Sequence, residues 1–245
     1  MLEDLNTTEE VKQPSIFLFM IEFVRSWVER IQSWSFRRNY EPARLGDGHA
    51  VLVIPGIIAH DFQMEPLRRM LDRLGYRTYA WEMGFNLADL EEIDILEKKI
   101  VKLHQDTGQK VSVIGWSLGG IYARDLARRH PDKIRQIFTL GSPFRGITKP
   151  TRASWVVHAL KGNLEELIDL EWIKALENPT QVLTTSIYSK SDGVLPWSYC
   201  FDSVEDESHR NLEVVSSHLG FPHNREVLKI IADYLPDGND LNKKN

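Results

Sequence analysis

A serine stands in a setting that is typical of enzyme nucleophiles. Ser117 lies at the centre of the motif Gly115-Trp-Ser-Leu-Gly119, after a short apolar run at 111–114 and before a helical pattern at 118–129. This motif between a strand and a helix is typical of a sharp turn that lifts the serine hydroxyl above a sheet. The glycines are expected because side chains beside the serine would collide where backbone segments come close. A tight turn that only packs would carry the same motif, so the chemical interpretation depends on partners for Ser117.

A base and an acid for Ser117 follow later predicted strands. A serine hydroxyl needs a base, and on an open parallel sheet catalytic groups gather at the carboxyl ends of strands. Asp192 follows a predicted strand at 181–188, and His218 is the first histidine after a predicted strand at 212–215. His218 would take the Ser117 proton, and Asp192 would accept the imidazole Nδ1–H and hold the tautomer. A lone aspartate could equally form a turn and a lone histidine is usually structural, but the order Ser, Asp, His after three strands predicts a triad.

The same chemistry needs N–H groups for the oxyanion of a tetrahedral intermediate. The N–H of Leu118, directly after the serine, is one expected donor. The second should come from the loop after the first core strand, which reads Pro55-Gly-Ile-Ile58. Gly56 would let the backbone turn close to a substrate. We expect the N–H of Ile57 to be the second donor, with Ile58 as the alternative.

Short apolar runs alternate with helical patterns along most of the chain. Such runs predict buried strands, and the periodic segments between them predict helices. The alternation predicts an α/β fold with a mostly parallel sheet of about six strands and helices on both faces. The predicted strands cover 50–54, 77–81, 111–114, 134–140, 181–188 and 212–215, and the predicted helices cover 62–74, 88–104, 118–129 and 224–234.

Two segments lie outside this alternation. Residues 146–180 are too long for a simple connection and carry a helical pattern, so they predict a short cap inserted in a domain over 49–245. Residues 1–48 are predicted to hold an acidic tail and an amphipathic helix over 15–36. Its mixed charges favour packing on the domain or on a second copy, and peripheral contact with a membrane is the alternative. The charged residues that lie mostly opposite its apolar side are Glu22, Arg25, Glu29 and Arg30.

Composition excludes several classes of protein. The 245 residues carry 30 Lys and Arg against 35 Asp and Glu, a formal charge of −5, which argues against a nucleic-acid partner bound through a basic face. The lone Cys200 excludes an internal disulfide. The early apolar run is too short to span a bilayer, and the acidic start lacks the basic region of a signal peptide. We therefore expect a cytoplasmic protein, and we expect no metal or cofactor because no ligand spacing or phosphate loop stands out.

Taken together, these motifs resemble the α/β-hydrolase superfamily, and more narrowly its bacterial lipase- and esterase-like members with a short cap. The resemblance extends from Ala50 to Leu235 and rests on the serine motif, on Thr139-Leu-Gly-Ser-Pro-Phe144 and on the stretches around the predicted acid and base. It implies the triad Ser117, Asp192 and His218. The sequence departs from many relatives at Pro55, where they have histidine before the glycine.

The predicted activity is hydrolysis of carboxylic esters with apolar acyl groups, in a small molecule or a lipid, through an acyl-enzyme. An acyltransferase or a thioesterase would use the same acyl-enzyme, so these remain alternatives. A non-catalytic binding module on the same fold is the third hypothesis, which a missing triad residue would favour, and none is missing. The residues expected to contact the substrate are Ile58, Trp116, Phe144, Trp155, Trp197 and Leu219.

Overall fold

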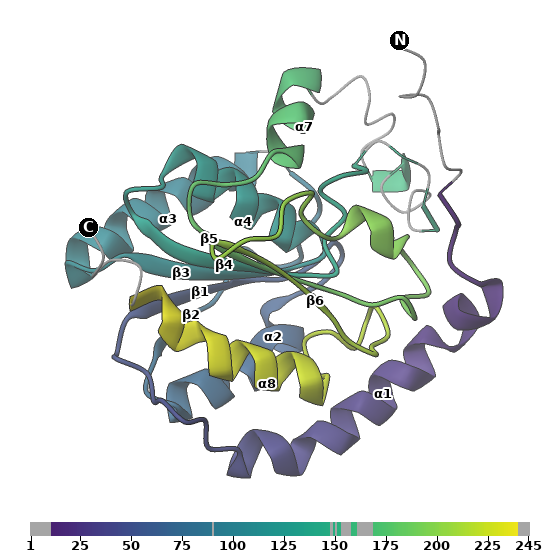
Figure 1. Cartoon of the computed structure of the whole chain (residues 1–245), viewed down its shortest axis with the longest axis horizontal. Coiled ribbons are helices and arrows are strands. Elements are labelled where there is room, and N and C mark those ends of the chain that lie inside the picture. The colour runs from purple at the N-terminus through teal and green to yellow at the C-terminus, as the bar shows by residue number, and fades with distance from the viewer. Residues whose placement is uncertain are drawn as a thin grey trace.

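The sheet has the predicted parallel architecture, which confirms the α/β class. The computed structural model describes residues 11–89, 91–147, 149, 151–152, 158–160 and 169–239. Six strands lie in the order β2-β1-β3-β4-β5-β6, and every neighbouring pair is parallel (Figure 1). Chain order reverses between β1 and β3, and such switch points open a crevice at the carboxyl ends of the strands. The strands are β1 (Ala50–Ile54), β2 (Arg77–Tyr79), β3 (Val111–Trp116), β4 (Ile134–Leu140), β5 (Leu183–Tyr188) and β6 (His209–Glu213).

Helices cover both faces of the sheet (Figure 1). One face carries α2 (Asp61–Arg73) and α8 (Arg225–Tyr234), with α1 (Ile16–Asn39) beside them. The other face carries α3 (Glu91–Thr107) and α4 (Leu118–Arg129). Within the predicted cap, α7 (Leu170–Glu177) packs against α4. Two short 3₁₀ turns, η1 (Trp197–Tyr199) and η2 (Leu235–Asn239), complete the order.

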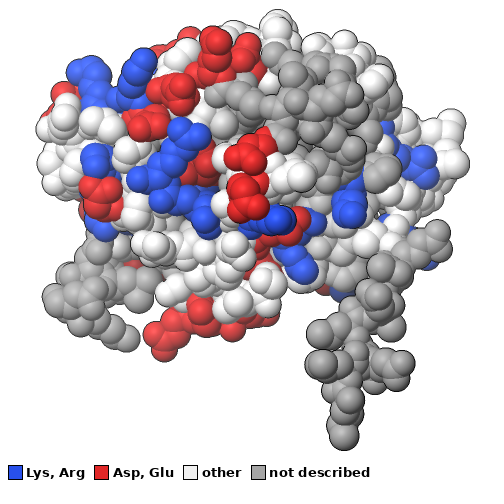
Figure 2. Space-filling view, turned by 90° about the horizontal axis from the view of Figure 1, so that it is seen from above, with Lys and Arg blue, Asp and Glu red and all other residues white. Residues whose placement is uncertain are grey.

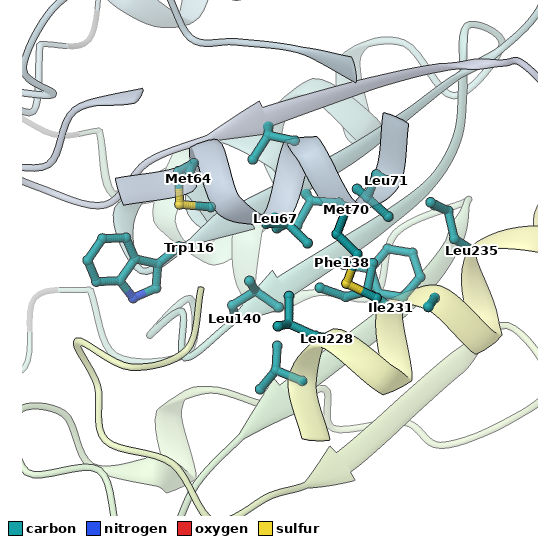
Figure 3. Close-up of a cluster of buried hydrophobic side chains, with 14 of the residues drawn as sticks. Met64, Leu67, Met70, Leu71, Trp116, Phe138, Leu140, Leu228, Ile231 and Leu235 are labelled. Carbon is teal, nitrogen blue, oxygen red and sulfur yellow. The ribbon is translucent and has the colours of Figure 1, made fainter. Parts of the chain in front are cut away.

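A buried apolar cluster lies on each face of the sheet. Every residue of β1 is buried, as expected for a central parallel strand that is covered on both faces. Figure 3 shows the cluster between the sheet and the α2 and α8 layer. The burial of these apolar side chains stabilises the sheet, and the sheet in turn positions the loops at the carboxyl ends of its strands. The labelled members are Met64, Leu67, Met70, Leu71, Trp116, Phe138, Leu140, Leu228, Ile231 and Leu235.

Two elements start three residues away from the predicted position, and each difference has a physical reason. Helix α3 begins at Glu91 rather than at Ala88, because Ala88 has φ of 61° and cannot join a right-handed helix. Strand β6 spans His209–Glu213 rather than 212–215. It pairs only with β5, so it is an edge strand that tolerates polar residues, and the apolar Val215 is outside it and 72% exposed.

Helix α1 packs on the domain with its polar side. It contacts α2 and α8, and Phe36 and Tyr40 near its end pack against the first core cluster. Its two buried residues are Glu22 and Ser33, which reverses the usual amphipathic arrangement. Among the described residues, no helix is both long enough and apolar enough to cross a membrane. The exposed apolar side chains of α1 are Ile16, Phe17, Phe19, Met20, Phe23, Val24, Trp27, Val28, Ile31 and Trp34.

The face that carries α3 and α4 mixes charges of both signs. Figure 2 shows Lys and Arg next to Asp and Glu across the part of this face that is coloured. Arg129 of α4 contacts Asp94 and Glu97 of α3, and Lys99 of α3 contacts Glu82. The coloured surface in this view therefore carries no extended field of one sign.

A buried ion pair and two further hydrogen bonds of the same arginine tie α4 to the last part of the predicted cap and to the segment after β5. Both Arg124 and Asp202 are almost completely buried, and the guanidinium makes two hydrogen bonds of 2.9 and 2.8 Å to the carboxylate. Arg124 also donates to the carbonyls of Leu176 and Asn178. Each charge is compensated by the other, so removing one would leave the other buried without its partner.

We predict that Arg124→Ala lowers the free energy of unfolding by about 3–5 kcal/mol, because it leaves Asp202 as an uncompensated buried charge. Urea unfolding followed by circular dichroism measures this loss. Lys102→Ala is the control, because the Lys102–Asp106 pair is exposed and its removal should leave the midpoint within error. Equal midpoints for the two variants would contradict the structural role of the Arg124–Asp202 pair.

Candidate active site

The turn at Ser117 is held in a strained conformation. Ser117 has φ of 53° and ψ of −117°, between the end of β3 and the start of α4. Residues other than glycine rarely adopt these backbone angles, and backbone strain of this kind is concentrated at functional sites. A Cβ on Gly115 would lie 2.1 Å from the carbonyl oxygen of Gly119, and one on Gly119 would lie 2.4 Å from that of Ile54. Both positions therefore require glycine, for the reason that the sequence motif indicated.

The structure brings the three predicted triad residues together. The Oγ of Ser117 lies 3.0 Å from Nε2 of His218, and Nδ1 of His218 lies 2.7 Å from Oδ2 of Asp192. All three residues are buried, with exposed fractions of 7%, 5% and 3%. The other carboxylate oxygen of Asp192 accepts the N–H groups of Val194 and Leu195 at 2.7 and 2.8 Å. These bonds fix the acid, which in turn orients the imidazole toward the serine.

Electrostatics favour the protonated form of His218. Burial by itself would lower the pKa of His218, but the adjacent Asp192 carboxylate and its hydrogen bond, together with Glu22, raise it above its ordinary value. A raised pKa stabilises the imidazolium that forms when a histidine accepts a serine proton. The arrangement can therefore take a proton from Ser117 and hold it.

The backbone N–H groups after Ser117 and after Gly56 differ from that of Ile58 in their hydrogen bonding. The N–H of Ile58 donates to the carbonyl of Asn86 at 2.8 Å, so it is already used. Within the described part of the chain, the N–H groups of Ile57 and Leu118 have no hydrogen-bond partner. A Cβ on Gly56 would lie 3.1 Å from that of Ser117, which shows how closely this loop passes the serine. Of the two alternatives for the second donor, Ile58 already uses its N–H, and the role of Ile57 as the donor stays a prediction.

Asn86 holds this loop, and sequence reasoning did not single it out. Its side chain is fully buried and donates to the carbonyl of Pro55 at 2.9 Å, while its backbone bonds with Ile58 and Ala59. The Pro55 carbonyl therefore contributes to fixing this loop. No local motif marks Asn86, because its partners lie about thirty residues earlier in the chain.

Two of the expected substrate contacts are packed inside the protein instead. Trp116 is buried in the first core cluster, and its indole N–H donates to the carbonyl of His218 at 3.0 Å. Phe144 is fully buried, and the guanidinium carbon of Arg124 lies 3.8 Å from its ring centroid. The expectation that Phe144 contacts the substrate is therefore wrong, because its ring is fully buried. The buried Trp116 ring instead holds the backbone of His218 through its indole N–H. Sequence alone could not distinguish an aromatic core residue from a pocket wall.

The remaining expected contacts differ in how accessible they are. Ile58 and Leu219 are exposed, Ile58 at the end of the Pro55–Ile58 loop and Leu219 directly after His218. Trp197 stacks on Tyr188 and Phe201, in an aromatic group of its own. The predicted contact at position 155 lies outside the described residues.

A second Ser–His–Asp set exists, and its environment indicates a structural role. Nε2 of His49 lies 2.8 Å from Oγ of Ser112, and its Nδ1 contacts Asp47. Nη1 of Arg135 lies 2.8 Å from the same Nδ1, and burial together with this cation lowers the pKa of His49 to about 4. Ser112 is fully buried near the amino end of β3, away from the carboxyl edge where the strained turn lies. A base held against protonation in this way is poorly suited to accept a proton.

Comparison with solved structures shows the α/β-hydrolase fold. The chain superposes on Aspergillus fumigatus lipase B with a TM-score of 0.59 and 17% identity, over 80% of this chain and 55% of the lipase. It superposes on a monoacylglycerol lipase of Paleococcus ferrophilus with a TM-score of 0.58 and 15% identity, over 80% of this chain and 98% of that one. The mature lipase BlEst2 of Bacillus licheniformis gives 0.55 and 13% identity, over 81% and 96% of the two chains.

Sequence comparison gives one short match. Over 42 residues the chain is 48% identical to a pimeloyl-[acyl-carrier protein] methyl ester esterase of Aromatoleum aromaticum, and this covers 17% of either chain. No protein-family model matches the sequence. The fold is therefore shared across most of the chain, and close sequence similarity to that esterase is confined to a segment.

We predict that a fluorophosphonate probe labels Ser117 and leaves Ser112 unmodified, because only Ser117 combines an available base with free oxyanion donors. Ser117→Ala should abolish labelling, whereas Ser112→Ala should retain it. Intact-mass spectrometry and mapping of the labelled peptide measure both outcomes. Labelling that persists in Ser117→Ala would show that the strained turn does not hold the reactive serine.

Proposed function

We propose that this protein is a serine hydrolase that cleaves carboxylic esters of apolar acyl groups. The observation that carries the proposal is the hydrogen-bonded chain from Ser117 through His218 to Asp192. The N–H groups of Ile57 and Leu118, which have no partner among the described residues, support it. A nucleophile, a base, an orienting acid and oxyanion donors are the parts that acyl transfer needs. The α/β-hydrolase fold supports the same conclusion, and so does the segment shared with a methyl ester esterase.

The geometry suggests how each residue acts. His218 takes the hydroxyl proton while Oγ of Ser117 attacks the ester carbonyl, and the N–H groups of Ile57 and Leu118 bind the resulting oxyanion. His218 then gives the proton to the departing alcohol, which leaves an acyl group on Ser117. Water attacks this acyl-enzyme with His218 as base, releasing the acid. The Asp192 carboxylate holds the imidazole and stabilises the imidazolium in both half-reactions.

Ester hydrolysis should depend on the Ser117 hydroxyl and not on the Cys200 thiol. We predict that Ser117→Ala lowers kcat on p-nitrophenyl butyrate by roughly four to six orders of magnitude without altering the circular dichroism spectrum. Cys200→Ala is the matched control and should retain activity, because Cys200 is buried and burial followed by the Asp192 charge raises the pKa of its thiol. Turnover that survives in Ser117→Ala would refute the proposed nucleophile.

The acceptor of the acyl group separates hydrolysis from transfer. Water and an added alcohol or amine can compete for the same acyl-enzyme, so the product ratio reports the preferred acceptor. A hydrolase releases mainly the free acid at millimolar acceptor concentrations. Predominant transfer would instead favour the acyltransferase alternative, and rapid turnover of thioesters alone would favour a thioesterase.

We also propose that the exposed apolar side of α1 docks on a lipid surface. Large apolar side chains line this side, including Phe17, Met20, Phe23 and Trp27, while the polar side packs on the domain. The apolar surface continues toward the site, because Leu219 is also exposed and its carbonyl accepts a hydrogen bond from Ser26 of α1. A helix of this kind lies in a membrane interface with its apolar side buried. This position would bring the site close to esters of apolar acids.

We predict that the protein co-sediments with phosphatidylcholine–phosphatidylglycerol vesicles, and that Phe23→Asp with Trp27→Asp weakens binding at least roughly tenfold. Gln32→Asp adds a charge to the same helix without removing an apolar group, so it should bind nearly as the parent does. Hydrolysis of a soluble ester should be unchanged in all three proteins. If vesicles are not bound and analytical ultracentrifugation shows a dimer that the double variant dissociates, a second copy covers this side and the proposal is wrong.

A further inference from the structure

One carboxylate of α1 joins the backbone segments that carry the acid and the base. Glu22 is 3% exposed. Its Oε1 accepts the N–H of Gly193 at 2.8 Å, and its Oε2 accepts the N–H of Leu219 at 3.1 Å. Gly193 follows Asp192 and Leu219 follows His218 in the chain. The Glu22 side chain thus accepts hydrogen bonds from the residues that directly follow Asp192 and His218.

Other polar residues of α1 hold the preceding residues of the same two loops. Arg25 donates to the carbonyl and the hydroxyl of Ser191 at 2.6 and 2.9 Å, and Ser191 precedes Asp192. Glu29 accepts the N–H and the hydroxyl of Ser217 at 2.8 and 3.0 Å, and Ser217 precedes His218. In each of the two loops, α1 is therefore hydrogen-bonded to the residue before and the residue after the predicted catalytic residue.

The loops and α1 fit too closely for this contact to be incidental. A Cβ on Gly193 would lie 2.6 Å from the backbone of Leu18, so the aspartate loop touches the helix backbone. Gly220 makes a similar approach to the carboxylate of Glu29. Neither glycine has a positive φ among the described residues, so close contact rather than a turn accounts for them.

The charge of Glu22 acts on the site as well as its hydrogen bonds. Burial raises the pKa of the Glu22 carboxyl, and the nearby Asp192 adds to this, while the His218 side chain and the backbone N–H groups of Leu219 and His218 lower it. Arg25 lies 3.7 Å away on the same helix and balances part of the charge. In its ionised form Glu22 stabilises a positive charge on His218, because opposite charges attract strongly away from solvent.

We infer that Glu22 is a positioning residue, which holds Asp192 and His218 in register through Gly193 and Leu219 and stabilises the imidazolium formed during proton transfer. This inference rests on the proposed function, since it assigns Glu22 a role toward the same triad. Sequence reasoning placed Glu22 on the side of the helix opposite the apolar residues. Its distance of about 170 residues from Gly193 and about 197 from Leu219 hides the connection.

Steady-state kinetics of Glu22→Gln against pH test the inference. Glutamine loses the charge and one of the two acceptor oxygens, so kcat on p-nitrophenyl butyrate should fall by roughly 10–100-fold while KM changes little. The groups that face His218 are Ser117, Asp192 and Glu22, with Arg25 behind Glu22. Removing the Glu22 charge lowers the pKa of His218, so the acid limb of kcat/KM should move to lower pH.

Glu29→Gln is the matched control, because Glu29 is bonded only to the histidine loop and does not contribute to the shifted pKa of His218. It should cost less activity and leave the acid limb in place. A merely structural role for Glu22 would lower stability and activity without moving the acid limb. Wild-type kcat and an unmoved acid limb in folded Glu22→Gln would overturn the inference.

The rate of fluorophosphonate labelling separates this inference from the proposed function. Labelling of Ser117 needs the triad but no ester, so Glu22→Gln should label more slowly than the parent protein, by a factor comparable with its loss in kcat. If the parent is labelled but hydrolyses no ester, the proposed substrate class fails and the labelling rates still decide the role of Glu22. If the parent is not labelled at all, the proposed function fails and the inference fails with it. Equal labelling rates would overturn the inference alone.

Discussion

The backbone at Ser117 imposes the constraint on which the rest of the site depends. A serine at φ of 53° is strained, at a cost of order 1–3 kcal/mol, and it persists only where its surroundings fix it. Its N–H donates to the carbonyl of Leu140 on β4, and Gly119 lies against the carbonyl of Ile54 on β1. Three central strands therefore converge on one turn. The two apolar clusters that cover this sheet supply the burial that holds the turn in place.

Unlike Ser117, which lies among the central strands, Asp192 and His218 lie in loops that follow β5 and β6, near the open edge of the sheet. Strand β6 has one neighbour, and the loop with His218 leaves that edge. The two loops present backbone N–H groups and serine hydroxyls toward α1, and buried N–H groups must find acceptors. The carboxylates of Glu22 and Glu29 provide them. This requirement explains why α1 turns its polar side inward and leaves its apolar side exposed.

Aromatic residues near the site illustrate how packing decides between similar roles. Trp116 is the last residue of β3, and its indole N–H donates to the backbone carbonyl of His218 and so fixes it. Phe144 lies under the guanidinium of Arg124 and contributes to the core. Both rings precede or follow residues of the site in the chain, and proximity in sequence gave no information on which way they point. Exposed apolar groups at Ile58 and Leu219 remain at the surface beside the catalytic loops.

The sequence by itself determined the α/β class, the parallel sheet and the three residues that meet at its carboxyl edge. It could do so because strand alternation, the glycine–serine–glycine turn and the order Ser117, Asp192, His218 are encoded locally or in simple order along the chain. The tertiary structure alone decided that Ile58 uses its N–H in a bond to Asn86 while that of Ile57 has no partner among the described residues, and that Asn86 fixes that loop. It also decided the orientation of α1, because the polar groups that select its inner side belong to loops more than 160 residues away. Periodicity shows that a helix has two sides, but only its partners determine which side is buried.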